Sequence, residues 1–201
     1  MATTYVERRE KPAVAVPGIE AIERPRGERP VMGARIWGGL RLALGWVFLW
    51  AFADKLLGLG FATGRAEDGT IQLFGPDAWI NGGSPTAGFL EFATKGPFAA
   101  FFQGLAGAAW VDWVFMLSLL AIGVALILGV ATRLAAIGGV IWMGLMYAAS
   151  AIWPENNPFV DDHVVYAIVL GGIAYVGAGR YLGLGRWWEQ TALVKRFPVL
   201  K

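Results

Sequence analysis

The sequence contains no cysteine and a single histidine, and these two shortages exclude several classes of redox protein. Without cysteine the chain can hold no disulfide, no iron–sulfur cluster, no thiolate zinc site, no c-type haem and no cysteine nucleophile. A haem held between two histidines is also excluded unless a partner chain supplies one of them. Any redox chemistry of this chain must therefore use a diffusible cofactor such as a quinone, or a cofactor bound by a partner.

Charge is also scarce: 16% of the 201 residues are charged, whereas 56% are hydrophobic and the mean hydropathy is +0.52. So apolar a chain is typical of an integral membrane protein rather than of a soluble domain. The 28 Gly and 10 Trp support this interpretation, since both residues are common in membrane helices or at their interfaces. The basic residues flank apolar runs, so the lipid bilayer is the expected partner and nucleic acid is not.

Four apolar runs follow a polar N-terminal segment. Residues 1–32 are rich in Pro, Glu and Arg, which predicts a disordered cytoplasmic tail. The runs lie at 36–61, 111–131, 134–153 and 163–179. Each is close to the roughly 20 residues that cross about 30 Å of hydrocarbon as a helix. The sequence therefore predicts an all-α, four-helix transmembrane bundle over residues 33–186, followed by a cytoplasmic C-terminal tail over 187–201.

The distribution of Lys and Arg predicts the orientation. All but three of the 17 basic residues lie before or at the start of the first run, between the second and third runs, or after the fourth. Because Lys and Arg concentrate in cytoplasmic segments, we expect a multi-pass plasma-membrane protein with both termini in the cytoplasm. The three others are Lys55, Arg65 and Lys95, which accompany an acidic outer segment.

This outer segment, residues 62–110, is unusually apolar for a loop. Ser84 followed by Pro85 is typical of a helix N-cap with proline at the first helical position. We therefore expect a short helix over 85–94 and a second over 97–105. Their Phe side chains indicate that both lie along the outer interface and cover the mouth of the bundle. The tryptophans expected in interfacial aromatic belts are Trp79, Trp110 and Trp113 on the outer side, and Trp187 and Trp188 on the inner side.

Charged side chains also fall within or beside the apolar runs. Ionisable groups in a membrane span are costly, so Asp54 is a candidate catalytic residue and Lys55 a candidate ligand-binding residue. The alternative is that both reach the outer interface or neutralise each other. Arg41 is expected to extend to the inner headgroups. Arg133 is interpreted as a topology anchor, although a cation there could also steady an anionic ligand.

The loop before the fourth run contains the single histidine. Asp161 or Asp162 could cap the helix that follows, because acids are favoured at helix N-termini. Histidine gains and loses a proton near neutral pH, so His163 beside Asp162 could supply protons to a quinone being reduced. The alternative is a capped helix whose first-turn histidine bonds a neighbour. One His with two adjacent Asp lacks the spacing of known metal sites, so no metal site is predicted.

The order and spacing of short motifs resemble the DoxX-like membrane proteins. Residues 52–56 (FADKL) are similar to the end of that family's first helix. Residues 157–159 (NPF), followed by Asp162-His163, are similar to the start of its fourth helix. The stretch 79–90 (WINGGSPTAGFL) resembles the DoxD branch most closely. The resemblance covers residues 36–185.

The resemblance implies the membrane subunit of a thiosulfate:quinone oxidoreductase, which passes electrons from thiosulfate to membrane quinone and yields tetrathionate. It implies a separately encoded DoxA-like or other redox partner, and it leaves a homo-oligomer open. It adds Trp79, Asn81, Ser84 and Asn157 to Lys55 as candidate substrate-binding residues. Because the outer loops are acidic, only Lys55, Arg65 or Lys95 could attract the thiosulfate dianion. The competing hypotheses are a non-catalytic scaffold or accessory subunit of a redox or respiratory complex, and a small-molecule transporter.

Overall fold

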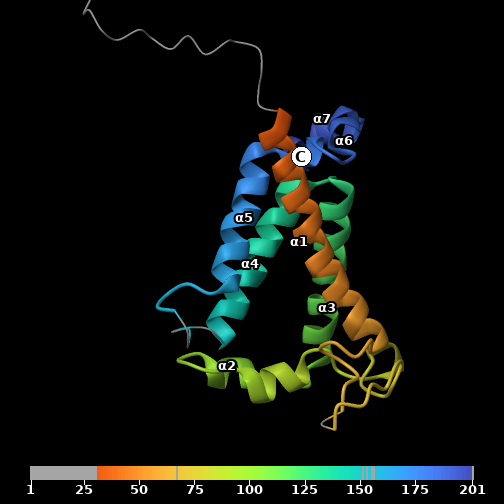
Figure 1. The fold of residues 1–201 in the computed structure, drawn as a ribbon, viewed down its shortest axis with the longest axis vertical. Coiled ribbons are helices and arrows are strands. Elements are labelled where there is room, and N and C mark those ends of the chain that lie inside the picture. Colours follow the sequence, from red (N-terminus) through yellow and green to blue (C-terminus); the bar gives the residue numbers. More distant parts are fainter. Residues whose placement is uncertain (1–30, 67, 151, 153, 155–156, 201) are drawn as a thin grey trace, which may run out of the picture.

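The computed structural model describes residues 31–66, 68–150, 152, 154 and 157–200, and over these residues the fold is all-α (Figure 1). This part of the chain contains no β-strand, only an isolated antiparallel bridge between Arg65 and Ile71. The four principal helices are α1 (Val31–Leu57), α3 (Ala109–Leu128), α4 (Thr132–Ser150) and α5 (Asp162–Val176). The predicted tail over 1–32 lies outside the described residues, apart from its last two positions.

Short helices account for most of the remaining secondary structure. Between α1 and α3 lie η1 (Trp79–Asn81), the single π-helical turn η2 (Phe89–Ala93) and α2 (Ala99–Gln103). After α5 come η3 (Ala178–Arg180), α6 (Gly185–Gln190), α7 (Ala192–Arg196) and η4 (Pro198–Leu200).

Three of the principal helices, α1, α3 and α4, are long and apolar enough to cross a membrane. Three such helices indicate a multi-pass membrane protein. The fourth, α5, has 15 residues and therefore extends over about 22 Å, less than the roughly 30 Å of a hydrocarbon core. The run predicted as a fourth span is thus a helix, but a shorter one than expected.

The principal helices form a ring in which α1 packs against α3 and α5, while α4 packs against α3 and α5. We call the end that holds residues 31–41, 129–133 and 177–200 the basic end. The opposite end, with residues 58–108 and the loop between α4 and α5, is the loop end. In Figure 1 the start of α1 and helices α6 and α7 lie together at the basic end, and α2 crosses the loop end transversely.

Apolar side chains at helical spacing fill the centre of the ring. The buried residues of this core include Leu44, Phe48, Met116, Leu126, Leu170 and Ile173. Two glycines permit the closest helix approaches. A Cβ atom on Gly123 would lie 2.8 Å from the backbone nitrogen of Leu49, and one on Gly172 would lie 2.3 Å from the indole of Trp37. Between membrane helices, where lipid is as apolar as the side chains, such close packing is a main source of association.

Several predicted boundaries are wrong by part of a turn or more. Helix α1 begins and ends earlier than the predicted 36–61, and it ends before Gly58, whose φ of +63° suits glycine. The helix expected over 85–94 is limited to residues 87–93, which include η2, and the one expected over 97–105 is confined to α2. The predicted cap of the last principal helix is confirmed, because Asp161 accepts a hydrogen bond from the Val164 N–H at 3.2 Å.

The C-terminal residues 187–201, treated in the sequence as a tail, include helical turns packed at the basic end. Thr191 caps α7 by accepting a 3.4 Å hydrogen bond from the Val194 N–H. The Trp188 indole donates to the Leu200 carbonyl at 2.6 Å. Short helices of this kind can form in a segment that lacks the hydrophobic periodicity of a long helix. They form because their caps and tertiary contacts compensate for the cost of helix nucleation.

The expectation that Arg41 extends to the headgroups is wrong. Its side chain is fully buried, and it donates to the carbonyls of Leu126 and Ile127 and, from Nη2, to those of Tyr181 (3.2 Å) and Leu182 (2.9 Å). The last carbonyls of a helix have no partner within the helix and carry its negative dipole end. Arg41 therefore joins α1 to the end of α3 and to the segment that follows α5.

Candidate ligand site

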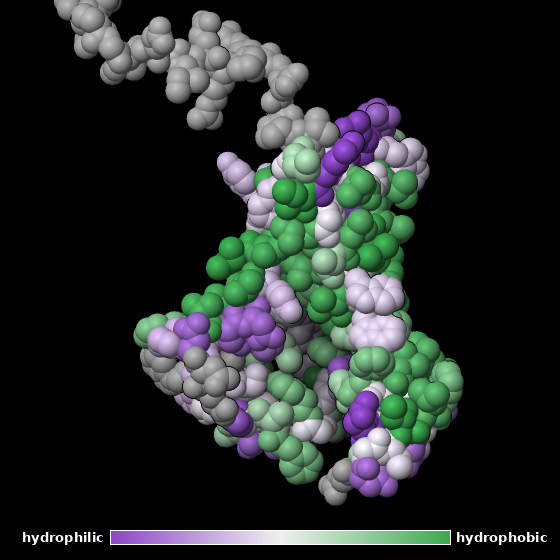
Figure 2. Space-filling model, viewed as in Figure 1, coloured by the Kyte–Doolittle hydropathy of each residue, from purple (hydrophilic) through white to green (hydrophobic). Residues whose placement is uncertain are grey.

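A cavity of about 1030 Å³ opens at the loop end between α3, α4 and the segment that joins α1 to α3. We call it the loop-end cavity. Figure 2 shows the hollow in the lower half of the molecule, between the two lobes of the loop end. The joining segment is tied to α4 by a 2.8 Å hydrogen bond from the Lys95 N–H to the Ala149 carbonyl. The cavity is thus enclosed by segments far apart in the sequence.

Six aromatic side chains line the loop-end cavity. They are Phe89, Phe101, Phe102, Trp110, Phe115 and Trp142. Phe115 of α3 and Trp142 of α4 meet edge to face at 5.3 Å between ring centroids, which brings the two helices together on one wall. Flat apolar rings provide stacking surfaces at geometries that favour edge-to-face or offset contact with another ring. This wall therefore suits a flat, lipophilic ligand.

Two cationic side chains, Lys55 and Arg65, also line the cavity. The Lys55 ammonium lies 5.9 Å from the centroid of the Phe115 ring, and no carboxylate of the described residues is within ion-pair distance of it. Arg65 donates from Nε to the Gly60 carbonyl at 3.0 Å. A half-buried ammonium facing an aromatic wall can donate to a ligand oxygen or attract an anion.

Ser84 lines the same cavity and takes part in a polar cluster around Asp112. The Asp112 carboxylate, 8% exposed, accepts from the Ser84 hydroxyl (2.9 Å), the Thr86 hydroxyl (2.6 Å) and the Thr86 N–H (3.2 Å). The Ser84 oxygen also accepts from the Ala87 N–H at 3.1 Å, which is the local bond expected of a capping serine. This cluster holds the joining segment against the start of α3.

Asp54 does not line the cavity, although it is next to Lys55 in the sequence. Its carboxylate is 2% exposed and accepts from the N–H groups of Phe61 (3.1 Å) and Ala62 (2.9 Å). Both oxygens thus hold the chain where it turns back after α1. Neighbouring residues on a helix point about 100° apart, so the two charges face different surroundings. Asp54 therefore stabilises the turn after α1, whereas Lys55 lines the cavity.

Three of the candidate substrate-binding residues, Trp79, Asn81 and Asn157, do not line the loop-end cavity. Trp79 packs edge to face on Trp113 at 4.7 Å and lies beside the central core. Asn81 donates to the carbonyls of Phe74 (2.6 Å) and Gly75 (3.2 Å), which closes a local turn. Asn157 is exposed.

His163 is also outside the cavity, at the start of α5. Its Nδ1 lies 2.6 Å from an oxygen of Asp161, and the other oxygen of Asp161 caps the helix. Asp162, the predicted catalytic partner, is 69% exposed and lies 3.5 Å from the same ring nitrogen. The ligand atoms of these three residues lie within 4.8 Å of one another. Asp161 is therefore the residue that orients the imidazole.

Asp112 and Thr86 are site residues that the sequence reasoning did not single out. Asp112 lies near the start of the apolar run 111–131, and this position could have indicated a site residue. Carboxylates within or beside a membrane span are rarely left without partners. The cavity itself has no sequence signal, because it depends on how the joining segment folds back on α3 and α4.

Comparisons of the chain with protein-family models, with curated proteins and with solved structures find no match. The DoxX-like resemblance therefore stays a prediction from short motifs.

Proposed function

We propose that this chain is a membrane protein that binds quinone in the loop-end cavity, and that it serves as the DoxD-like membrane subunit of a thiosulfate:quinone oxidoreductase. The observation that carries the proposal is the aromatic cavity with Lys55 in its wall. A quinone is a flat, apolar ring with two carbonyl oxygens, so aromatic side chains can stack on the ring while the ammonium donates to an oxygen. The volume lies near the upper end of small-molecule sites and leaves room for part of an isoprenoid tail.

The electron donor in this proposal is a small sulfur anion. Two thiosulfates joined by a new sulfur–sulfur bond release two electrons, and the quinone takes up these electrons with two protons. Lys55 and Arg65 provide positive charge at the cavity wall where a dianion could approach. A DoxA-like or other redox subunit completes the enzyme in this proposal.

The proposed topology has four membrane crossings, with both termini in the cytoplasm. The concentration of Lys and Arg at the basic end supports this orientation. Helix α5 packs along α4, and a short span of this kind is accommodated by local thinning of the bilayer at modest cost. The loop-end cavity would then face the outer side of the membrane.

A second candidate function is an accessory subunit that holds quinone for another redox protein without catalysing its reduction. It is favoured by the position of His163, which does not line the loop-end cavity, and by the use of both Asp54 oxygens in backbone hydrogen bonds. With this arrangement the described wall of the cavity lacks the predicted proton donor.

Two measurements on the same samples separate the candidates. Quinone binding is followed by quenching of tryptophan fluorescence, since Trp110 and Trp142 line the cavity. Turnover is followed as thiosulfate-dependent reduction of a soluble quinone by membranes with and without the protein, with any co-purifying partner added. We expect Lys55→Met to abolish turnover and weaken binding about tenfold, while Lys195→Met, an exposed lysine at the opposite end, changes neither.

Binding without turnover would favour the accessory subunit. Absence of quinone binding by a folded sample would contradict both candidates.

His163→Gln tests the predicted proton donor. If His163 supplies protons, the substitution slows turnover most at high pH, where protons from water are scarce. A pH profile that matches that of the unsubstituted protein would end this role.

A further inference from the structure

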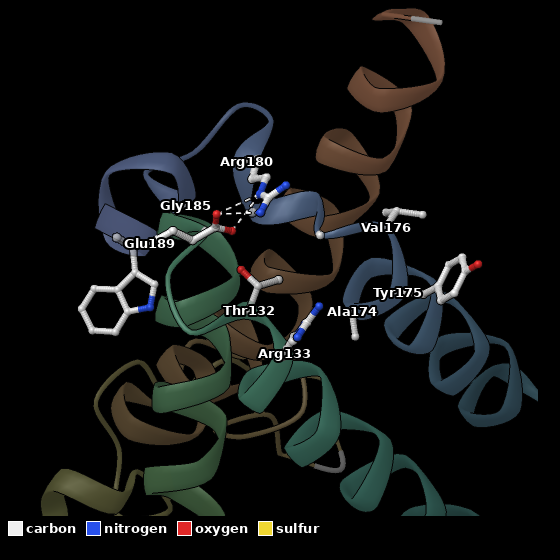
Figure 3. Close-up of a pocket in the computed structure, with 12 residues that line it drawn as sticks. Thr132, Arg133, Ala174, Tyr175, Val176, Arg180, Gly185 and Glu189 are labelled. Carbon is white, nitrogen blue, oxygen red and sulfur yellow. Dashed lines mark hydrogen bonds and ion pairs between the residues drawn. The ribbon is translucent and has the colours of Figure 1, made fainter. Parts of the chain in front are cut away.

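A second, smaller cavity of about 140 Å³ lies at the basic end, between the start of α4, the end of α5 and helix α6 (Figure 3). We call it the basic-end pocket. The lining residues that matter here are Thr132, Arg133, Tyr175, Arg180, Trp188 and Glu189. It shares no lining residue with the loop-end cavity, so its ligand is independent of the proposed quinone function.

The pocket lies at the N-terminus of α4, a 19-residue helix. The first N–H groups of a helix have no partner within it and carry the positive end of its dipole. Among the described residues, the N–H groups of Arg133 and Leu134 donate to no protein group. Helix N-termini of this kind bind phosphate and other anions.

A hydroxyl without a protein partner, on an otherwise buried residue, lines the same space. Thr132 is 5% exposed, and no hydrogen bond joins its hydroxyl to any of the described residues. In Figure 3 its oxygen lies on the side of the Glu189 carboxylate, and the Arg133 side chain lies on the other side of Thr132. A buried hydroxyl is normally hydrogen-bonded. The arrangement therefore leaves a donor in the pocket wall that a ligand could use.

The charges around the pocket leave it cationic. Arg180 donates to Glu189 from Nε at 2.8 and 3.0 Å and from Nη2 at 2.7 Å, so the one carboxylate in the wall is paired. This pairing raises the pKa of Arg180 above its usual value, and the arginine stays charged. Arg133 adds a second guanidinium, which the structure joins to no carboxylate of the described residues.

We propose that the basic-end pocket binds a phosphate group, with the Thr132 hydroxyl and the first α4 N–H groups as donors and Arg133 as the compensating charge. The group can come from the headgroup of an anionic phospholipid or from free phosphate. Exposed aromatic side chains occur on the helices that form the pocket, Tyr175 of α5 at 90% and Trp187 of α6 at 61% exposed, as expected where a protein meets the headgroup layer. Basic pockets between membrane helices on the cytoplasmic side bind lipid headgroups in this way.

Equilibrium binding to the delipidated full chain in a neutral detergent tests the proposal. The probes are phosphatidylglycerol, diacylglycerol with the same acyl chains, and inorganic phosphate. We expect phosphatidylglycerol to bind and diacylglycerol not to, with Arg133→Gln weakening binding about tenfold. Arg35→Gln removes an exposed charge at the same end of the molecule outside the pocket and should leave binding unchanged.

A matched pair at Thr132 separates ligand contact from folding. Thr132→Val removes the hydroxyl and should weaken binding several-fold, whereas Thr132→Ser keeps it and should retain binding. Saturable binding of inorganic phosphate that is lost in Arg133→Gln would identify free phosphate as the source and support the site. Phosphatidylglycerol binding that is equal in Arg133→Gln, Thr132→Val and the unsubstituted protein would overturn the proposal.

Discussion

The two ends of the helix ring are joined in different ways, although α1 reaches both. At the basic end the buried guanidinium of Arg41 donates to four carbonyls from two segments, and the pocket described there measures about 140 Å³. At the loop end the ring is spanned by a separate segment, and a cavity of about 1030 Å³ lies between that segment and the helices. Of the two cations of α1 that lie away from the helix start, Arg41 is hydrogen-bonded to main-chain carbonyls, whereas Lys55 lines the loop-end cavity and is available to a ligand. In an apolar protein, the position of the free carbonyls thus decides whether a buried cation is structural.

The largest expected loss of stability follows from removing the hydrogen bonds that Arg41 makes at the basic end. Arg41→Met leaves the carbonyls at the end of α3 and at Tyr181 and Leu182 without donors, in a site that is buried or half-buried. Hydrogen bonds to charged groups and the penalty for buried unpaired acceptors predict a loss of about 4 kcal/mol or more. Thermal unfolding in detergent measures it, with Arg35→Met, an exposed arginine on the same helix, as the control. An equal, small effect of both changes would contradict the structural role of Arg41.

The next effect concerns the segment that spans the loop end. Asp112→Ala removes the acceptor for Ser84 and Thr86 and should lower stability by about 2–4 kcal/mol. The segment 84–108 should also become more accessible to protease. Asp112→Asn keeps one acceptor oxygen and is expected to have a smaller effect. If limited proteolysis gives the same pattern for both variants and the unsubstituted protein, the carboxylate does not hold the segment.

A larger side chain in the wall should fill part of the loop-end cavity without disturbing the packing of the principal helices. Ser118 lines it on α3, so Ser118→Leu should weaken quinone binding about tenfold while the unfolding temperature stays nearly unchanged. Ala121, exposed on the same helix and outside the cavity, provides the control variant Ala121→Leu. Quenching of tryptophan fluorescence by quinone measures both. Undiminished affinity in Ser118→Leu would place the quinone elsewhere.

The smallest expected effect is at the start of α5. Asp161→Ala removes a helix cap and the partner of His163 and should cost about 1 kcal/mol. Asp162→Ala, at an exposed neighbour, should be close to neutral. Unfolding temperatures of the two variants compare the adjacent acids directly, and a larger loss in Asp162→Ala would reverse the assignment.

Part of the site could be predicted from single residues. Lys55 stands out because a lysine within an apolar run is unusual, and the structure does place it in a cavity. Asp54 stands out for the same reason, yet its oxygens are taken by Phe61 and Ala62. The sequence signal is the same for both residues. What separates them is which face of α1 each occupies and where the chain turns after Gly58.

Periodicity and composition by themselves determined the all-α class and the three long apolar helices, and they predicted an acidic N-cap for α5 without choosing between Asp161 and Asp162. These depend on contacts between near neighbours in the chain and on the length of apolar runs. The tertiary structure alone decided that Arg41 is buried, that Asp112 holds the joining segment, and that the two cavities lie at opposite ends. Each of these depends on carbonyls, hydroxyls and rings that are brought together from distant segments. Such groups become partners only after the helices have packed.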